Sequence, residues 1–403
     1  MMNKKGSASV FLVFILTAVI FMTAAFIYAA KEIAFESYED GLLGIASRSV
    51  LSEFHTELKD RYGIFAFESH GSDTEADIRG YVNESLLVNG ERRLEEIKVK
   101  FGDYSLGNPE VFKEQILDYM KFAITEDLFS QEVEEEESQG HRKSRTLRNE
   151  QIIQGLPSRP MKEQSESFLE WGKNIASQMG NVTQIFDQTK ENYLMNKYIL
   201  MHFKNKIDRP SSEPSFFENE VEYILEGDYS NEKNYEKTRR GLVLFRSSLN
   251  AIYLYVNPQK RAETLAAAEI LTPGPAAVVT QAVLIGTWSL AEAENDAKLL
   301  ERKKPVALFK DDRTWATDLQ SILDNKEKGC IETKSKKGLY YEDYLMIFLS
   351  FQDEELKLMR IMDLIQINMK GSCDKDFLIR TLNCGFQMKA VINGREYAYE
   401  TRY

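Results

Sequence analysis

The chain has 403 residues, enough for two domains or for one large domain with insertions. Hydrophobic residues make up 43% of it and charged residues 28%, which excludes a wholly disordered chain and a membrane protein with many spans. The formal net charge is −12, and a surface this acidic repels phosphate backbones, so nucleic acid is not expected as a partner.

The N-terminus carries the strongest signal in the sequence. Residues 7–30 contain no charged side chain, and a helix of that length spans ~36 Å, more than the ~30 Å hydrocarbon core of a bilayer. Lys4 and Lys5 precede this segment, and acidic residues dominate soon after it. Residues 1–30 are therefore predicted to form a cytoplasmic tip and a single transmembrane helix, with residues 31–403 extracytoplasmic. A cleaved signal peptide is the alternative, although its apolar core is usually only ~7–15 residues long.

Residues 31–62 are predicted to continue the helix as a stalk. No Pro occurs between Ser7 and Tyr62, so we expect one unbroken helix over this whole stretch. Apolar residues recur along the stalk at helical spacing and predict a face that packs on a globular head; they are Leu43, Val50, Leu51, Phe54 and Leu58. A helix that is lipid-bound in one half and packed on a head in the other has the layout of a pilin-like subunit.

The next two segments differ in character. Residues 63–130 are expected to form a membrane-proximal α/β part, with a helix at 74–88, a strand near 97–104 and a helix that opens at Asn108-Pro109. Residues 131–166 carry mixed charges and few apolar side chains, which predicts a linker or an exposed insertion. A docking site for a charged partner is the alternative for this segment.

Residues 167–403 are predicted to form a mainly helical head that ends in a β-hairpin. A core-facing helical stripe is formed by Leu242, Phe245, Leu249, Ile252 and Val256, and a second one by Leu358, Ile361, Met362 and Ile365. Residues 276–291 are apolar but short for a membrane span, so a buried core helix is expected there. Asn393-Gly394 suits a type I′ turn in a hairpin over residues 386–400, which should pair with the strand near 97–104. The predicted class is α+β, mainly α, with a small antiparallel sheet.

Catalysis needs a nucleophile, a base and an orienting group, and the sequence offers no such set. The four histidines are His55, His70, His141 and His202, and we expect a helix-face or core role for them. The acid pairs Asp311-Asp312 and Glu354-Glu355 point in different directions on a helix. We therefore expect no enzyme, no cofactor, no metal site and no small-molecule substrate.

Three cysteines are too few for a scaffold built on disulfides. Cys373 and Cys384 could form one disulfide that closes a small loop before the final hairpin, which would leave Cys330 over. Buried or free thiols are the alternative for all three.

Several segments together resemble a known family. Lys4-Lys5-Gly6 before a long apolar helix is similar to a prepilin-type leader, and the stretch from Gly6 to Phe67 resembles an uncharacterised family found beside Tad (Flp) pilus genes in Gram-positive bacteria. That family is similar in layout to TadE/TadG-like minor pseudopilins. Further matches to its pattern are Glu222 to Leu225, Arg246, Asn250, Trp288, Ala291-Glu292, Asp296, Tyr341, Asp343 to Leu345, Arg360 and Asp363 to Ile365.

The resemblance implies a structural role. It suggests a membrane-anchored accessory component of a Tad-type pilus or secretion assembly, with membrane lipid and other pilus or pseudopilin subunits as partners. A cut after Gly6 would make Phe11 the fifth mature residue, where pilins carry Glu, so we expect the anchor to stay uncut. The alternative function is a membrane-anchored extracytoplasmic module that binds a ligand or acts on the cell wall.

Overall fold

The computed structural model describes residues 4–68, 71–87, 93–130, 153, 155–159, 190–207, 215–324, 329–333 and 337–403. It confirms the predicted class, α+β and mainly α, with a small antiparallel sheet. The chain forms two compact units, which are described separately. Unit 1 combines the chain up to Lys59 with Phe65–Asn108 and Arg380–Tyr403, and unit 2 combines Asp60–Ile64 with Pro109–Ile379.

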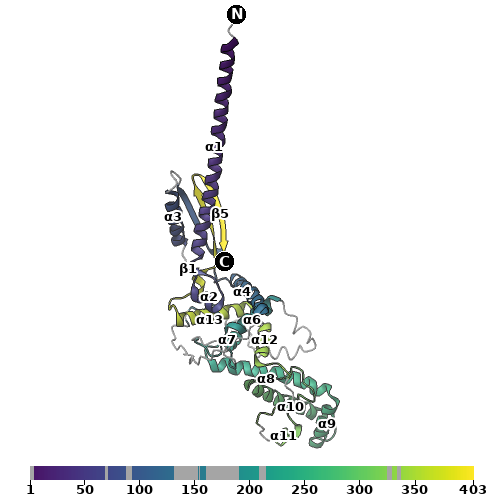
Figure 1. Cartoon of the computed structure of the whole chain (residues 1–403). Coiled ribbons are helices and arrows are strands. Elements are labelled where there is room, and N and C mark those ends of the chain that lie inside the picture. The colour runs from purple at the N-terminus through teal and green to yellow at the C-terminus, as the bar shows by residue number, and fades with distance from the viewer. Residues whose placement is uncertain are drawn as a thin grey trace. The chain divides into compact units, whose positions relative to one another are not determined.

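Helix α1 (Lys4–Leu51) is the longest element of unit 1 (Figure 1). Its N-terminal half is apolar and bare, since the large side chains from Val10 to Tyr28 are all about half exposed or more. The helix has the length and composition of a membrane span, and none of its most apolar 18-residue window is buried in the protein. It is the one candidate span found among the described residues.

The predicted unbroken helix to residue 62 is wrong in its last part. Helix α1 ends at Leu51, and α2 (Thr56–Tyr62) begins after a break of four residues. The Tyr403 hydroxyl donates to the Leu51 carbonyl, and the His55 N–H donates to Ala66 O at 2.8 Å. These bonds from distant parts of the chain satisfy backbone groups that a continuing helix would use, so the helix stops there.

Three strands form an antiparallel sheet in the order β2-β4-β5; they are β2 (Leu94–Lys100), β4 (Gly385–Ile392) and β5 (Arg395–Arg402). The predicted hairpin is confirmed, with positive φ at both turn residues, 47° at Asn393 and 74° at Gly394. Strand β2 pairs with β4 as expected, but it starts at Leu94, and Gly102–Tyr104 forms the 3₁₀ turn η1 instead of strand. A second, two-stranded sheet pairs β1 (Phe67–Glu68) with β3 (Leu382–Asn383).

The core of unit 1 lies between the three-stranded sheet and two helices. Alternate residues of β4 are buried on one face of the sheet, as a period of two requires. Helix α3 (Gly71–Leu87) and the second half of α1 cover that face. The core residues are Leu43, Ala46, Val50, Phe67, Ile78, Val82, Leu86, Leu94, Ile97, Val99, Phe386, Met388, Ala390 and Ile392.

Unit 2 is helical in its described part. Its elements are α4 (Pro109–Ser130), α6 (Lys190–His202), α7 (Glu220–Glu226), α8 (Asn231–Val256), α9 (Pro258–Leu271), α10 (Ala277–Glu301), α11 (Leu319–Leu323), α12 (Tyr341–Phe351), α13 (Glu354–Ser372) and η4 (Ile379–Thr381), which reaches into unit 1. Helix α13 is buried along nearly its whole length, from Leu356 to Met369. Helices α8, α9 and α10 pack on one another in a three-helix group.

The division into units differs from the boundaries expected from the sequence. Residues 109–130 belong with the helices of unit 2, although they were expected with residues 63–108. The C-terminal hairpin belongs to unit 1 and not to the helical head, because β4 pairs with β2 and adds its apolar face to the core there.

Two apolar segments of unit 2 are less buried than expected. On α8, Leu242, Phe245 and Leu249 are buried as predicted, but Ile252 and Val256 are 42% and 74% exposed. Leu254 is buried in their place, against Ile285 and Trp288 of α10. Residues 276–291 do begin a helix, but it is not a core helix, because one of its faces is open to solvent.

The predicted linker at 131–166 lies mostly outside the described residues. Its residues 155–159 are described, and they do not behave as an exposed insertion. Leu156 is 4% exposed and Ser158 is 7% exposed. Ser158 bonds to the buried Asp363 of α13, which explains why this short stretch is held in unit 2.

Candidate functional site

Alternate side chains of β5, together with Tyr403 just after it, bind the stalk half of α1. The Arg395 guanidinium lies 3.3 Å from a carboxylate oxygen of Glu32 and 3.4 Å from one of Glu36. The Tyr397 hydroxyl donates to Glu39 at 2.6 Å. Further along, the Tyr399 hydroxyl bonds to Asp40, and Tyr403 reaches Leu51 as described above. Figure 1 shows β5 beside this part of α1.

These contacts give the acidic residues after the apolar segment a second meaning. In the sequence they indicate only the orientation of a membrane span, whereas in the structure they are the polar partners of β5. Burial, followed by the hydrogen bond to Glu39, raises the pKa of Tyr397 to about 12, so this hydroxyl remains a donor throughout the physiological range. The strand therefore fixes where the free, apolar half of α1 begins.

The residues of the predicted packing face lie on α1, on α2 and in the break between them. Leu43 and Val50 lie in the core of unit 1, and Leu51 packs against that core from its edge. Phe54 lies in the break after α1, where its ring meets those of Phe65 and Tyr403 at centroid distances of 5.3 and 6.4 Å. Leu58 is fully buried on α2.

A buried ionic network joins α8 and α10 in unit 2. Arg246 binds Asp296 at 3.0 Å, and the Lys310 ammonium lies 2.7 Å from both Asp296 and Glu292. The Glu292 oxygen that binds Lys310 also accepts the Ala316 N–H, and the other Glu292 oxygen accepts the Thr317 N–H. Two cations thus balance two carboxylates, and the network ties the segment after α10 back onto the helices.

A second buried network surrounds Asp363 on α13. Its carboxylate accepts bonds from Ser158 and, at 2.7 Å, from the Tyr223 hydroxyl. Burial raises the pKa of Asp363 to about 6. One turn earlier, Arg360 donates to the last carbonyl groups of α7 and packs against Gly227, whose φ of +67° and close neighbour leave no room for a side chain.

These two networks contain many of the residues on which the family resemblance depends. Glu222 is another residue of the family pattern. It is fully buried, and one oxygen of its carboxylate accepts bonds from the Tyr341 hydroxyl and the Lys206 N–H. Most of their polar atoms bond to the protein itself, so these residues hold the helices in place. The second carboxylate oxygen of Glu222 is the exception, since it is buried and has no hydrogen-bond partner among the described residues.

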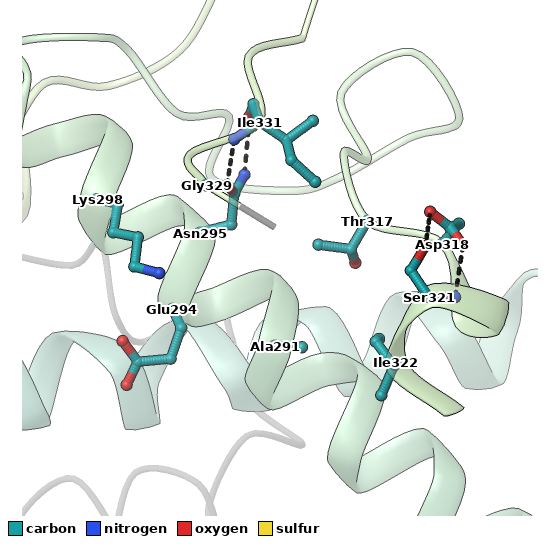
Figure 2. Close-up of a pocket in the computed structure, with 10 residues that line it drawn as sticks. All are labelled: Ala291, Glu294, Asn295, Lys298, Thr317, Asp318, Ser321, Ile322, Gly329 and Ile331. Carbon is teal, nitrogen blue, oxygen red and sulfur yellow. Dashed lines mark hydrogen bonds between the residues drawn. The ribbon is translucent and has the colours of Figure 1, made fainter. Parts of the chain in front are cut away.

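Figure 2 shows a pocket of about 220 Å³ beside α10. Its lining residues are Ala291, Glu294, Asn295, Lys298, Thr317, Asp318, Ser321, Ile322, Gly329 and Ile331. The Asn295 amide makes two bonds to the backbone of Ile331, at 2.7 and 2.9 Å. Asp318 accepts the Ser321 N–H and hydroxyl at the start of α11. These lining groups are used to hold the loops.

His202 lines a second pocket of about 310 Å³, within unit 2. Its Nδ1 lies 2.8 Å from the Arg61 carbonyl, which assigns the proton to this nitrogen. Burial lowers the pKa of His202 to about 4, so the ring is neutral at physiological pH. Nε2 is shielded from solvent and has no hydrogen-bond partner among the described residues. The ring packs against Tyr198 and Tyr119, which is the environment of a core histidine.

Among the described residues, His55 and members of both acid pairs named from the sequence contact different partners. His55 follows α1, at 3.6 Å from Glu57, while His70 and His141 lie outside the described residues. Asp311 accepts bonds from its own turn, Asp312 from Tyr253, and Glu354 pairs with Lys113. No group of three metal-ligating side chains occurs in the described part of the chain.

The suggested disulfide between Cys373 and Cys384 is not formed. Cys373 is exposed at the end of α13 in unit 2, whereas Cys384 is buried between β3 and β4 in unit 1. Cys330 is partly exposed, and burial raises the pKa of its thiol.

Comparison with known proteins gives a family without a function. Residues 129–394, about two thirds of the chain, match the model of a family of unknown function, DUF5702. The match covers both buried networks and strand β4, and it excludes α1. No curated protein and no solved structure matches the chain. On the extent of this match, the chain belongs to the family of unknown function DUF5702.

Proposed function

We propose that the chain is a single-pass, membrane-anchored, pseudopilin-like accessory component of a Tad-type pilus or secretion assembly. It acts through helix packing and contacts with other subunits, and not through catalysis. One observation carries the proposal: a single continuous helix is bare and apolar from Val10 to Tyr28 and is held by a sheet from Glu32 onward.

The bare half of α1 suits a helix that packs in lipid. Its two threonine hydroxyls are bonded inside the helix, since Thr17 and Thr23 donate to Phe14 O and Ile20 O at 2.9 Å. A polar group that bonds to its own helix does not oppose burial in hydrocarbon. Small residues at both ends, from Ser7 to Ser9 and from Thr23 to Ala25, would let a neighbouring helix approach closely.

Charge supports one orientation for this helix. Lys4 and Lys5 precede the apolar segment, and Glu32, Glu36 and Glu39 follow it. The positive-inside rule then favours a cytoplasmic N-terminus, with residues 31–403 outside. The contacts of β5 with those acidic residues support the same boundary, because a folded sheet with charged partners belongs in water and not in the hydrocarbon core.

The test separates specific helix packing from simple anchoring. In a bacterium that carries this protein and makes Tad pili, residues 10–28 are replaced by an alternating Leu/Ala segment of equal length. We expect the variant to remain in the membrane at the wild-type level while surface pili are lost, because the helix contacts are removed and the anchor is kept. The matched control is His202→Gln with Cys373→Ala, which should keep pili at the wild-type level. Normal pili with the replaced segment, or lost pili with a folded control variant, would contradict the proposal.

A further inference from the structure

The N-terminal part of α10 presents an apolar face that no described part of the chain covers. Val278, Val279 and Val283 are 66%, 68% and 62% exposed, and Leu290 is 44% exposed. Ala282, Gly286 and Thr287 complete this face, hereafter the α10 face. Ile270 and Leu271 lie next to it, at 82% and 53% exposure, because the Thr272 and Thr280 hydroxyls bond the end of α9 to the start of α10.

The polar side chains around the α10 face are already bonded within the protein. Thr287 donates to Val283 O at 2.9 Å on its own helix. Gln281 donates to the Arg261 carbonyl and to Thr264 on α9. Covering the face therefore removes apolar surface from water without leaving these polar groups unsatisfied.

The size of the face fits one side of a protein interface. Fully burying an aliphatic side chain contributes ~1.5–3 kcal/mol at ~25 cal/mol/Å², which corresponds to ~60–120 Å² each. At their observed exposures the six large side chains therefore offer roughly 200–450 Å² of apolar surface. One partner of a standard interface contributes ~800 Å², of which about two thirds is apolar in homodimers. The face supplies roughly 40–85% of that apolar area.

The absence of charged residues on the α10 face favours a second copy of the chain as its partner. The chain has a net charge of −12, so two copies repel each other unless they meet where neither carries charge. In a symmetric pair the same patch of both copies meets across the two-fold axis, so a charge near the axis lies close to the identical charge of the second copy, which makes a charged centre unfavourable. Residues 270–291 contain no charged side chain over 22 positions, and only residues 7–30 form a longer charge-free run.

The order of side chains along α10 is self-complementary. Val278, Ala282, Gly286 and Leu290 are spaced by four and form one ridge on the exposed side. A two-fold axis at the middle of this ridge sets Ala282 against Gly286 of the second copy and Val278 against Leu290. The small pair lies at the crossing point, where packing of two such ridges at about −50° needs close approach. A Cβ built on Gly286 has no neighbour within 4 Å, so the protein itself leaves that space open.

We propose that the α10 face binds a second copy of this chain across a two-fold axis. This inference is independent of the pilus role: a monomeric chain would overturn it and leave the proposed function standing.

The test is the mass of the full chain purified in detergent, measured by sedimentation equilibrium. The wild-type protein should reach twice the chain mass of 46.5 kDa. Val283→Asp places two like charges beside the axis and should weaken dimerisation at least tenfold. Ile252→Asp, at an exposed aliphatic position of α8, is the matched control and should leave the dimer intact. A monomeric wild type, or a dimer that Val283→Asp does not weaken, overturns the proposal.

A second measurement does not depend on how Val283→Asp folds. The double variant Ala282→Cys with Gly286→Cys should form a covalent dimer under mild oxidation, whereas either single variant should form little, because each new thiol faces the other position of its partner. Equal cross-linking of the single and double variants contradicts the two-fold geometry. Quenching of a fluorophore on Ala282→Cys by nitroxide-bearing lipids would assign the face to the bilayer and also overturn the proposal.

Discussion

Replacing Leu43 by Ala tests whether the stalk half of α1 holds the sheet of unit 1 together. The Leu43 side chain is fully buried among α3, β2 and β4. Removing a buried Leu side chain to Ala costs ~2–5 kcal/mol, since transfer free energy is lost and a cavity remains. The matched control is Ile45→Ala, two residues along the same helix at a side chain that is 63% exposed, where a change within ~0.5 kcal/mol is expected.

The readout is hydrogen exchange of the backbone amides of β4, measured by mass spectrometry on the protein in lipid nanodiscs. Strand β4 is the central strand, bonded on both sides, so its amides report the opening of the sheet. A loss of ~2–5 kcal/mol accelerates their exchange roughly 30-fold to several thousand-fold, at tenfold per ~1.4 kcal/mol. Exchange in Leu43→Ala that is as slow as in Ile45→Ala would refute the packing of α1 on this sheet.

Three further predictions concern unit 2 and the N-terminus. Burial raises the pKa of Glu226 from 4.5 to about 7, so between these values only the unfolded chain loses the proton, and stability falls as the pH rises. Glu226→Gln should therefore stabilise unit 2 by about 3 kcal/mol at pH 8 and by almost nothing at pH 4.5, and equal gains at both would contradict this. Burial lowers the pKa of His202 to about 4, so between pH 6.5 and 4 only the unfolded chain takes up the proton, and stability falls as the pH falls. In urea titrations followed by Trp288 and Trp315 fluorescence, the wild type should lose about 2 kcal/mol relative to His202→Gln between pH 7 and 5, and a constant difference would contradict this. Mass spectrometry of the purified N-terminus should find no cut after Gly6, because Phe11 stands where pilins carry Glu, and a chain that starts at Ser7 would be the contrary result.

Local patterns in the sequence predict two elements of unit 1, the bare helix and the C-terminal hairpin. The charge-free run at 7–30 predicted the bare helix, and Asn393-Gly394 between alternating residues predicted the hairpin with its positive φ values. Both features depend on a few adjacent residues, and no distant contact competes with them. The pairing of β4 with β2 was also expected, because a lone hairpin is only marginally stable.

Most other features that depend on distant contacts do not follow from the sequence. The end of α1 at Leu51 is set in part by Tyr403, about 350 positions later, and the acidic residues after the apolar segment gave no sign of their partners on β5. Ser158 looked like part of a polar linker, yet it is buried against Asp363. The open face of α10 does not follow from the sequence, because an apolar run such as residues 276–291 has the same composition whether its helix is buried or exposed.

The central claim is that α1 crosses the membrane once and leaves residues 31–403 outside. Cys373 offers a direct test, since its thiol is exposed while that of Cys384 is buried. In cells that carry Cys330→Ala, stripped of their wall but otherwise intact, a membrane-impermeant maleimide should label the protein before lysis. Replacing Cys373 by Ala as well should abolish the label. Labelling that requires lysis would place the units inside the cell and contradict the account.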